Sequence, residues 1–261
     1  MSDSLSLYID RRSGLHRLNP LTKLTVAGFC LIAGLSLPGL LSGYVLLIGV
    51  LIPLSVWGSV SRAFLGRTWK VVLPFVISVI LIQGLLWRGG TPLVAIGPIS
   101  FKQEGVLFAV TSVGRMLAVV GSFLLLSLST RPDSLMIGLT QHGFSASVSY
   151  IILTTLQIVP RFQAKARQIL DAQRARGLET EGNILTRLKA LLPLLGPLIL
   201  SSIIEVEDRA IALEARAFKR SGPKTSLQVL HDSAPQQAAR RLMLIAAPLL
   251  VILRLVFEVV R

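Results

Sequence analysis

A run of 38 residues, 24–61, contains no Asp, Glu, Lys or Arg and reads LTVAGFCLIAGLSLPGLLSGYVLLIGVLIPLSVWGSVS. As a single helix it would be about 57 Å long at 1.5 Å per residue, whereas a hydrocarbon core of about 30 Å needs only about 20 residues. The pair Pro38-Gly39 lies near the middle of the run, and Pro followed by Gly is typical of a turn. The run therefore predicts two membrane spans, 21–37 and 40–57.

The composition of the whole chain indicates the same class of protein. Of its 261 residues, 52% are hydrophobic and only 15% are charged, and the mean hydropathy is +0.69. A soluble domain has about 25% charged residues, so this chain has too few charges to coat a soluble surface. A lipid-exposed backbone must satisfy its own hydrogen bonds, and the apolar runs are continuous rather than alternating as in an outer-membrane barrel. The composition therefore predicts membrane-spanning helices.

Later apolar runs raise the predicted number of transmembrane helices to about five. The further spans are predicted at 71–87, 105–130 and 242–260. Arg62, Arg67 and Lys70 are predicted to form a short basic loop before the first of these, and 88–104 is predicted to form a loop on the outside. Basic residues mark cytoplasmic loops, so the net charge of +14 is interpreted as membrane topology. A nucleic-acid-binding surface, the usual meaning of such a charge in a soluble protein, is not predicted.

The residues between the fourth and fifth spans have a different character. The run 134–160 is uncharged but carries Gln, His and several Ser and Thr residues, so it is predicted to be interfacial or packed against protein. The block 161–241 holds 14 of the 27 basic and 8 of the 13 acidic residues. Within it, the 15-residue apolar stretch 190–204 is too short for a span. We expect that stretch to form a helix lying under the membrane.

These features divide the chain into three regions relative to the membrane. Residues 1–130 are predicted to hold a cytoplasmic N-terminal tail and four transmembrane helices, and 131–241 the interfacial and cytoplasmic part. Residues 242–261 are predicted to hold the last transmembrane helix. The predicted fold class is an all-α polytopic membrane protein with about five transmembrane helices and further amphipathic helices in the cytoplasm.

Two segments of the charged block resemble each other at an offset of 40 residues. Residues 172–178 read AQRARGL and residues 212–218 read ALEARAF, and each precedes a predicted helix break. On the helix before the second segment, Glu205 and Arg209 are spaced as an i,i+4 ion pair. The spacing alone allows two interpretations. The helices could face solvent or headgroups, with arginines that complement the helix dipole, or each could present one arginine to a partner.

Several further motifs resemble one known family over nearly the whole chain. They are Ser13-Gly14-Leu15-His16-Arg17-Leu18-Asn19-Pro20-Leu21-Thr22-Lys23-Leu24, Ile96-Gly97-Pro98-Ile99 followed by Glu104-Gly105 and Arg115, and Thr130-Arg131-Pro132-Asp133-Ser134-Leu135. Together with the two arginine segments, they are similar to the transmembrane (T) component of energy-coupling factor transporters, the cobalt-transport-protein Q family.

The resemblance implies a role for the two arginine segments. In this family, Ala-Arg-Gly motifs end the coupling helices that dock on ATPase subunits. The docking residues implied here are Ala175, Arg176, Gly177, Ala215, Arg216 and Ala217, supported on the coupling helices by Arg174, Arg209 and Glu214. Ala217 departs from the family pattern, which has glycine there. Because a Cβ disfavours positive φ, the sequence leaves open whether the tight turn after Arg216 forms.

The resemblance also implies partners and a location. Two cytoplasmic ATP-binding cassette ATPases would bind ATP and Mg²⁺ and hydrolyse the ATP. The coupling helices would pass their closure to a membrane substrate-binding (S) component that imports a vitamin or a metal ion. This chain itself would bind no cofactor and catalyse no reaction. It would lie in the lipid bilayer of a bacterial or archaeal cell (inner) membrane, with the N-terminus and coupling region in the cytoplasm and no nucleic-acid partner.

Two other classes of protein fit the residues less well. A secondary transporter or channel acting alone would carry ionisable residues in several spans, and only Arg115 is clearly intramembrane. A membrane enzyme would need clustered His, Asp or Glu, and none is seen. The single cysteine, Cys30, and three scattered histidines predict no metal site. Residues 222–225, GPKT, lack the spacing of a phosphate-binding loop.

Overall fold

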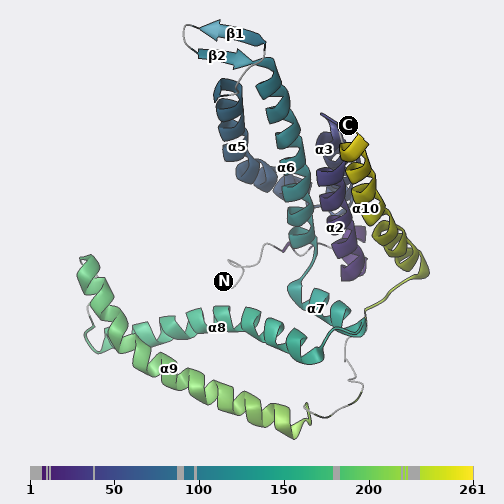
Figure 1. The fold of residues 1–261 in the computed structure, drawn as a ribbon. Helices are drawn as coiled ribbons and strands as arrows, with labels where there is room; N and C mark the ends of the chain where they lie inside the picture. The colour runs from purple at the N-terminus through teal and green to yellow at the C-terminus, as the bar shows by residue number, and fades with distance from the viewer. Residues whose placement is uncertain are drawn as a thin grey trace. The chain divides into compact units, whose positions relative to one another are not determined.

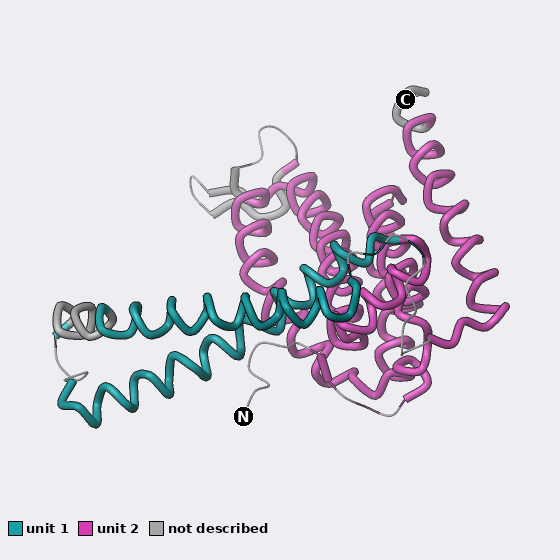
Figure 2. The backbone as a smooth tube through the Cα atoms, turned by 90° about the horizontal axis from the view of Figure 1, so that it is seen from below, with its two compact units in different colours: residues 1–5, 144–227 teal, residues 6–143, 228–261 magenta. Residues whose placement is uncertain are grey.

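The computed structural model describes residues 8–9, 11, 13–37, 39–86, 91–96, 99–178, 183–218, 220, 222 and 230–260. Most of this backbone is helical (Figure 1). The chain forms two compact units, coloured separately in Figure 2. The larger unit comprises Ser6–Gly143 and Gln228–Arg261, and the smaller unit comprises Met1–Leu5 and Phe144–Leu227. The three predicted regions concern position relative to a membrane and stay a prediction.

The first two predicted spans are two separate helical segments. After the one-turn α1 (Gly14–Arg17), α2 (Pro20–Ser36) begins at Asn19, whose side chain accepts a hydrogen bond from the backbone N–H of Leu21. The second segment consists of α3 (Ser42–Leu46), the π-helical η1 (Leu47–Leu51) and α4 (Ile52–Trp57). The wider π turns lie directly before Pro53, which has no N–H to continue an α-helical ladder.

The third and fourth predicted spans form a helical hairpin. α5 (Ser61–Leu86) and α6 (Gln103–Ser129) lie side by side and are joined through the antiparallel strands β1 (Pro92–Ile96) and β2 (Ile99–Lys102) (Figure 1). The prediction of a plain loop at 88–104 missed these strands.

The predicted basic loop is also wrong, because Arg62, Arg67 and Lys70 lie on the first turns of α5. Hydropathy locates the apolar part of a helix. It does not locate the first helical residue when the entering turns are polar.

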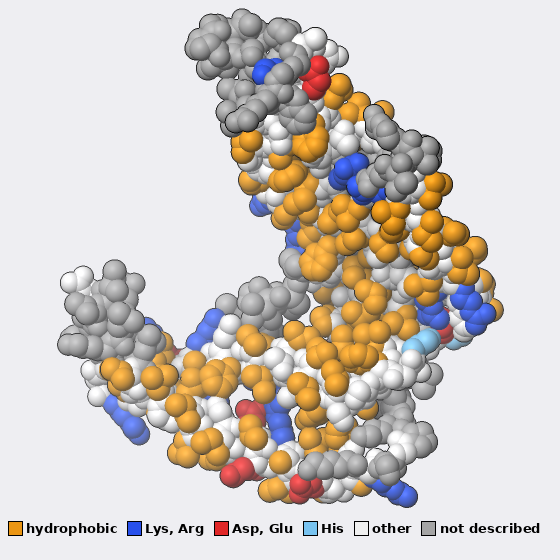
Figure 3. All heavy atoms as spheres, viewed as in Figure 1, with side chains coloured by type: hydrophobic (Ala, Val, Ile, Leu, Met, Phe, Trp, Pro, Cys, Tyr) orange, Lys and Arg blue, Asp and Glu red, His pale blue; other side chains and the backbone are white. Residues whose placement is uncertain are grey.

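The larger unit has the surface of a membrane protein. Two helical segments, Ser61–Gly84 and Gln103–Ser129, are long and apolar enough to cross a membrane, and Pro20–Ser36 and Ser42–Trp57 are shorter apolar segments. Large apolar side chains are exposed on several helices, among them Trp69, Phe123 and Ile245. Figure 3 shows hydrophobic side chains gathered on the visible face of this unit. The predicted class, an all-α membrane protein, is confirmed.

α6 packs against α5, α2 and α3, and small residues let these helices approach. A Cβ atom added to Gly43 of α3 would lie 2.1 Å from the carbonyl oxygen of Gly114 on α6. Because that oxygen belongs to the backbone, it cannot move aside unless the helix moves. Close packing through glycine is common between membrane helices, where van der Waals contact drives association.

Gly43→Ala is expected to lower the free energy of unfolding by roughly 1–3 kcal/mol, the usual cost of overpacking. Gly66→Ala on α5 is the matched control, because a Cβ atom there meets nothing within 4 Å. The control is expected to be neutral or more stable by up to about 1 kcal/mol, since alanine is the better helix former. Thermal unfolding of both variants in one detergent measures the difference. Equal stability would show that α3 and α6 are not in close contact at Gly43.

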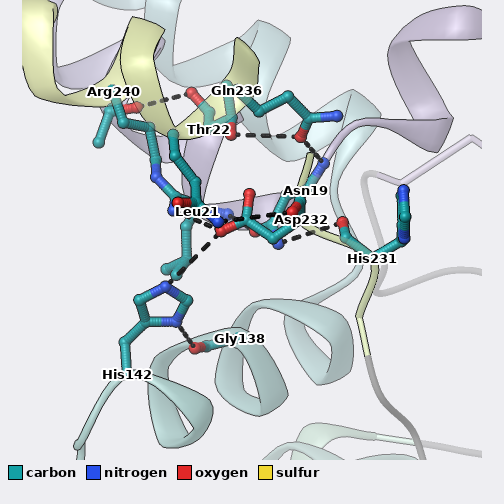
Figure 4. Close-up of polar contacts among 11 residues, drawn as sticks. Asn19, Leu21, Thr22, Gly138, His142, His231, Asp232, Gln236 and Arg240 are labelled. Carbon is teal, nitrogen blue, oxygen red and sulfur yellow. Dashed lines mark hydrogen bonds and ion pairs between the residues drawn. The ribbon is translucent and has the colours of Figure 1, made fainter. Parts of the chain in front are cut away.

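A polar cluster fixes the start of α10 (Ala234–Val260) to α2 (Figure 4). The backbone N–H of Asn19 donates to Oε1 of Gln236 at 3.0 Å. Nη2 of Arg240 donates to Oδ2 of Asp232 at 2.6 Å, and both side chains are largely buried. His142 directly follows the last turn of α7 (Pro132–Gln141), and its Nε2 lies 3.9 Å from the same carboxylate oxygen. The C-terminal helix is therefore held by charge and hydrogen bonds as well as by apolar packing.

The smaller unit consists of two long antiparallel helices, α8 (Ala146–Ala175) and α9 (Ile184–Ala215). The ring of Tyr150 near the start of α8 lies 5.3 Å from that of Phe218, which follows α9. Further along α8, Nη1 of Arg161 lies 3.7 Å from Oε1 of Glu205. These contacts join the start and the middle of α8 to the C-terminal part of α9.

The two runs between the fourth and fifth spans are not separate elements. The run 134–160 is divided between α7 and the first half of α8. The apolar stretch 190–204 is an internal part of α9, which includes Pro193 and Pro197. The polarity of the sequence changes within these helices, so composition alone did not mark their ends. Whether 190–204 lies under the membrane stays a prediction.

Candidate docking site

α8 ends in a tight turn built around Arg176 and Gly177. Arg176 is the C-cap residue, with φ −92° and ψ 7°, and Gly177 has a positive φ of +92°. The N–H of Leu178 donates to the carbonyl of Gln173 at 3.0 Å, and the N–H of Gly177 donates to the carbonyl of Arg174 at 2.9 Å. This pair of bonds defines a Schellman motif, which satisfies carbonyls left free at a helix end.

α9 ends in the same turn 40 residues later. Arg216 is the C-cap residue, with φ −89° and ψ 6°, and Ala217 has a φ of +54°. The N–H of Phe218 donates to the carbonyl of Leu213 at 3.0 Å, and the N–H of Ala217 donates to the carbonyl of Glu214 at 2.9 Å. The question left open by the sequence is therefore answered. The turn after Arg216 forms although alanine stands in the place of glycine.

Ala217→Gly is expected to stabilise this turn by about 1 kcal/mol, because the left-handed conformation costs a residue with a Cβ atom roughly 1–2 kcal/mol. Gly177→Ala is the matched reverse change and should destabilise the first turn by a similar amount. No atom lies within 4 Å of a Cβ there, so the cost is conformational. Hydrogen exchange of the Phe218 and Leu178 amides, which close the two turns, reports each change. We expect association with a partner to tighten or stay unchanged in Ala217→Gly, and a marked loss would show that the partner needs the Cβ atom.

Both turns present their arginine in the same surroundings. Arg176 and Arg216 are exposed, as are the preceding Ala175 and Ala215. In the described part of the chain, neither arginine has a carboxylate within 4 Å. The side chain before each arginine is a short methyl group. A partner surface can therefore approach the guanidinium closely.

The supporting arginines, Arg174 and Arg209, differ because each forms an ion pair with a carboxylate of its own helix. Nη1 of Arg174 lies 3.8 Å from Oδ1 of Asp171, and Nη2 of Arg209 lies 2.5 Å from Oε1 of Glu205. The predicted i,i+4 pair of Glu205 and Arg209 is thus confirmed, and Glu214 is exposed next to Ala215. The sequence did not reveal that Arg161 shares the Glu205 carboxylate, since that contact joins two helices.

The two turns lie at opposite ends of the helix pair. Phe218, directly after the second turn, contacts Tyr150 at the start of α8, whereas Arg176 lies at the end of α8. A helix running from residue 150 to residue 176 is roughly 39 Å long at 1.5 Å per residue. One small groove cannot hold both arginines, so the arrangement suits two separate binding grooves.

The described residues include no group of three or more His, Cys, Asp or Glu side chains that could hold a metal ion. On α6, Nε of Arg115 is buried without a hydrogen-bond partner in the described structure. That this chain binds neither metal nor nucleotide stays a prediction.

The fold and the two turns define an all-α membrane protein that exposes a pair of like, arginine-bearing helix ends. Comparison with known proteins gives the family. The model of the cobalt transport protein family (CbiQ) matches residues 11–227, and the chain belongs to this family.

Curated relatives agree with this assignment. The chain is 29% identical over 235 residues to the energy-coupling factor transporter transmembrane protein EcfT of Listeria innocua, covering 87% of this chain and 88% of the relative. It is 28% identical over 259 residues to the protein of that name from Lacticaseibacillus paracasei, covering 96% and 98%. The resemblance to the transmembrane component of energy-coupling factor transporters is confirmed.

Proposed function

We propose that this chain is the coupling subunit of an energy-coupling factor importer, in which Arg176 and Arg216 each dock on one of two ATPase subunits. The observation that carries the proposal is the repeated turn. Two helices end in the same Schellman geometry, and each exposes one arginine without a carboxylate partner in the described structure. Structural capping alone would not require an arginine at the same position of both turns.

Arginine suits such a contact for chemical reasons. Its planar guanidinium carries five N–H donors and no acceptor, and it makes paired hydrogen bonds to carboxylates or carbonyls. Bonds of this kind are roughly twice as strong as those between neutral groups. The Schellman turn fixes the backbone on both sides of the arginine, so little backbone freedom is lost on docking.

The helix pair provides a route for the displacement. α8 and α9 are joined at the start of α8 by the Tyr150–Phe218 ring contact and in the middle of α8 by the Arg161–Glu205 ion pair. Closure of two ATPases would move the two turns, and the joined helices would move with them. The ATPases would bind ATP and Mg²⁺, and a membrane S component would then release a vitamin or a metal ion inside the cell.

The proposal requires both turns to face the cytoplasm, as the positive-inside rule predicts for this basic region. A reporter inserted after Leu178 is expected to be cytoplasmic, and one inserted at Gly90 is expected to be outside. A second reporter is placed in the turn at Ser59–Val60, because an insertion at Lys70 would interrupt α5. This reporter is also expected to be cytoplasmic, because the first turns of α5 are basic. An external reporter after Leu178 would rule out docking, because no cytoplasmic ATPase could reach Arg176.

A further inference from the structure

A polar cavity of about 130 Å³ lies in the larger unit where α2 and α7 begin and α6 ends. On the same scale, a cavity needs about 10–15 Å³ to hold one water, so this one has room for a polyatomic group. Among the residues that line it are the cationic Arg17, Lys23 and Arg131 and the hydroxyl-bearing Ser129, Thr130 and Ser134. No Asp or Glu is among the described lining residues, so the described lining carries a net positive charge.

Lys23 is the buried cation of this cavity. It is only 7% exposed, and its Nζ donates to the backbone carbonyls of Ser129 at 2.9 Å and His16 at 3.3 Å. An ammonium has three N–H donors, so one is left over. In the described structure no carboxylate lies within 4 Å of it. A buried charge is costly unless it is paired, and an anion in the cavity would supply the pair.

The first turn of α7 contributes to the same cavity. Arg131 is the N-cap residue of this helix, and Ser134 lies on its first turn. Helix N-termini carry a partial positive charge that favours anions. The guanidinium of Arg131 packs over the ring of Tyr8, with Cζ 4.9 Å from the centroid, which limits its motion. Asp133 is exposed and does not line the cavity.

We propose that this cavity binds a phosphate group, either that of an anionic phospholipid or free inorganic phosphate. The inference does not depend on ATPase docking, because every residue involved belongs to the larger unit. Two guanidiniums, one buried ammonium and neighbouring hydroxyls match the charge and the several acceptor oxygens of a phosphate. The bound group would link the ends of α2, α6 and α7, which Lys23 already joins in part.

Ser134→Glu against Ser134→Gln tests the proposal most cleanly. Both variants add a side chain of the same size, but only one places a negative charge in the cavity. Glutamate on the first turn of a helix is favourable, so loss of anion binding could not be attributed to unfolding. Arg17→Gln removes one cation from an exposed position, and Arg241→Gln removes one from an exposed position on α10 that does not line the cavity.

The full chain, purified in a neutral detergent, is titrated with phosphatidylglycerol and separately with inorganic phosphate, and binding is counted by native mass spectrometry. We expect one probe to bind about tenfold more weakly to Ser134→Glu than to Ser134→Gln. Arg17→Gln should weaken that probe by about tenfold or more, from the loss of one charged hydrogen bond. Arg241→Gln should leave it unchanged. The probe that follows this pattern identifies the source, lipid or free phosphate. If neither probe binds, or if Ser134→Glu equals Ser134→Gln for both, the proposal is wrong.

Discussion

Replacing Arg176 and Arg216 together with alanine is expected to release the ATPase subunits from this chain. If each arginine fills a groove on one ATPase, each truncation removes one partner of a buried charged contact. Such a loss typically costs roughly 2–5 kcal/mol, which is about 30-fold or more in affinity. Because the two contacts act as linked binding sites, their loss also removes the avidity of the pair.

The single variants and a charge-matched control separate docking from a general effect of charge. Arg176→Ala or Arg216→Ala alone should leave a complex held by the other helix, with impaired substrate uptake. Arg167→Ala combined with Arg241→Ala removes the same net charge from exposed positions outside the two turns and should retain the complex. Pull-down of the ATPases and substrate uptake measure each variant. Wild-type behaviour of the Arg176/Arg216 double variant would show that both arginines are ordinary surface charges.

Asp232→Ala is expected to destabilise the larger unit by about 3–5 kcal/mol, the usual cost of leaving one partner of a buried ion pair unpaired. The side chains of Arg240 and Asp232 are only 11% and 15% exposed. Without Asp232, the buried guanidinium of Arg240 has lost its carboxylate partner. Thermal unfolding of the full chain in detergent measures the loss.

Asp171→Ala is the matched control, because Asp171 forms an ion pair with Arg174 on the surface, with side chains 72% and 49% exposed. Exposed pairs contribute about 0–1 kcal/mol, so this variant should keep nearly wild-type stability. Asp232→Ala combined with Arg240→Met should recover much of the loss, since no unpaired charge remains. In the described structure Oδ1 of Asp232 and Nη1 of Arg240 are already buried without partners. Equal stability of Asp232→Ala and Asp171→Ala would mean that the pair is solvated.

Hydropathy predicted the apolar helices well because the bilayer imposes their length. The two helical segments Pro20–Ser36 and Ser42–Trp57, and the break between them, follow from that constraint. The same signal could not locate the start of α5, where Arg62 and Lys70 lie on helical turns ahead of the apolar part. Hydropathy also could not show that the helix containing 190–204 continues to the second arginine turn, because the backbone hydrogen bonds of a helix do not depend on side-chain polarity.

The geometry of the candidate site was only partly predictable from its sequence. Local sequence indicated Arg176 with Gly177, since a glycine after a helix is typical of a Schellman turn. Ala217 carried the opposite local signal, and the turn there forms with Phe218 packed on Tyr150, a contact between residues distant in sequence. The basic cavity was also out of reach. Arg17, Lys23 and Arg131 come from separate motifs, and only the packing of α2 against α6 and α7 brings them together.

Photo-cross-linking from the two turns tests the docking claim most directly. A photoreactive phenylalanine analogue placed at Ala172 or Ala212, exposed and one helical turn before each arginine, should cross-link to an ATPase subunit in the assembled complex. With both positions labelled, we predict a product that carries two ATPase subunits. The photoreactive analogue placed instead at the exposed position of Trp69 on α5 should give no cross-link to an ATPase subunit. If neither Ala172 nor Ala212 yields an ATPase adduct while the complex stays intact, the two arginine turns are not the docking site.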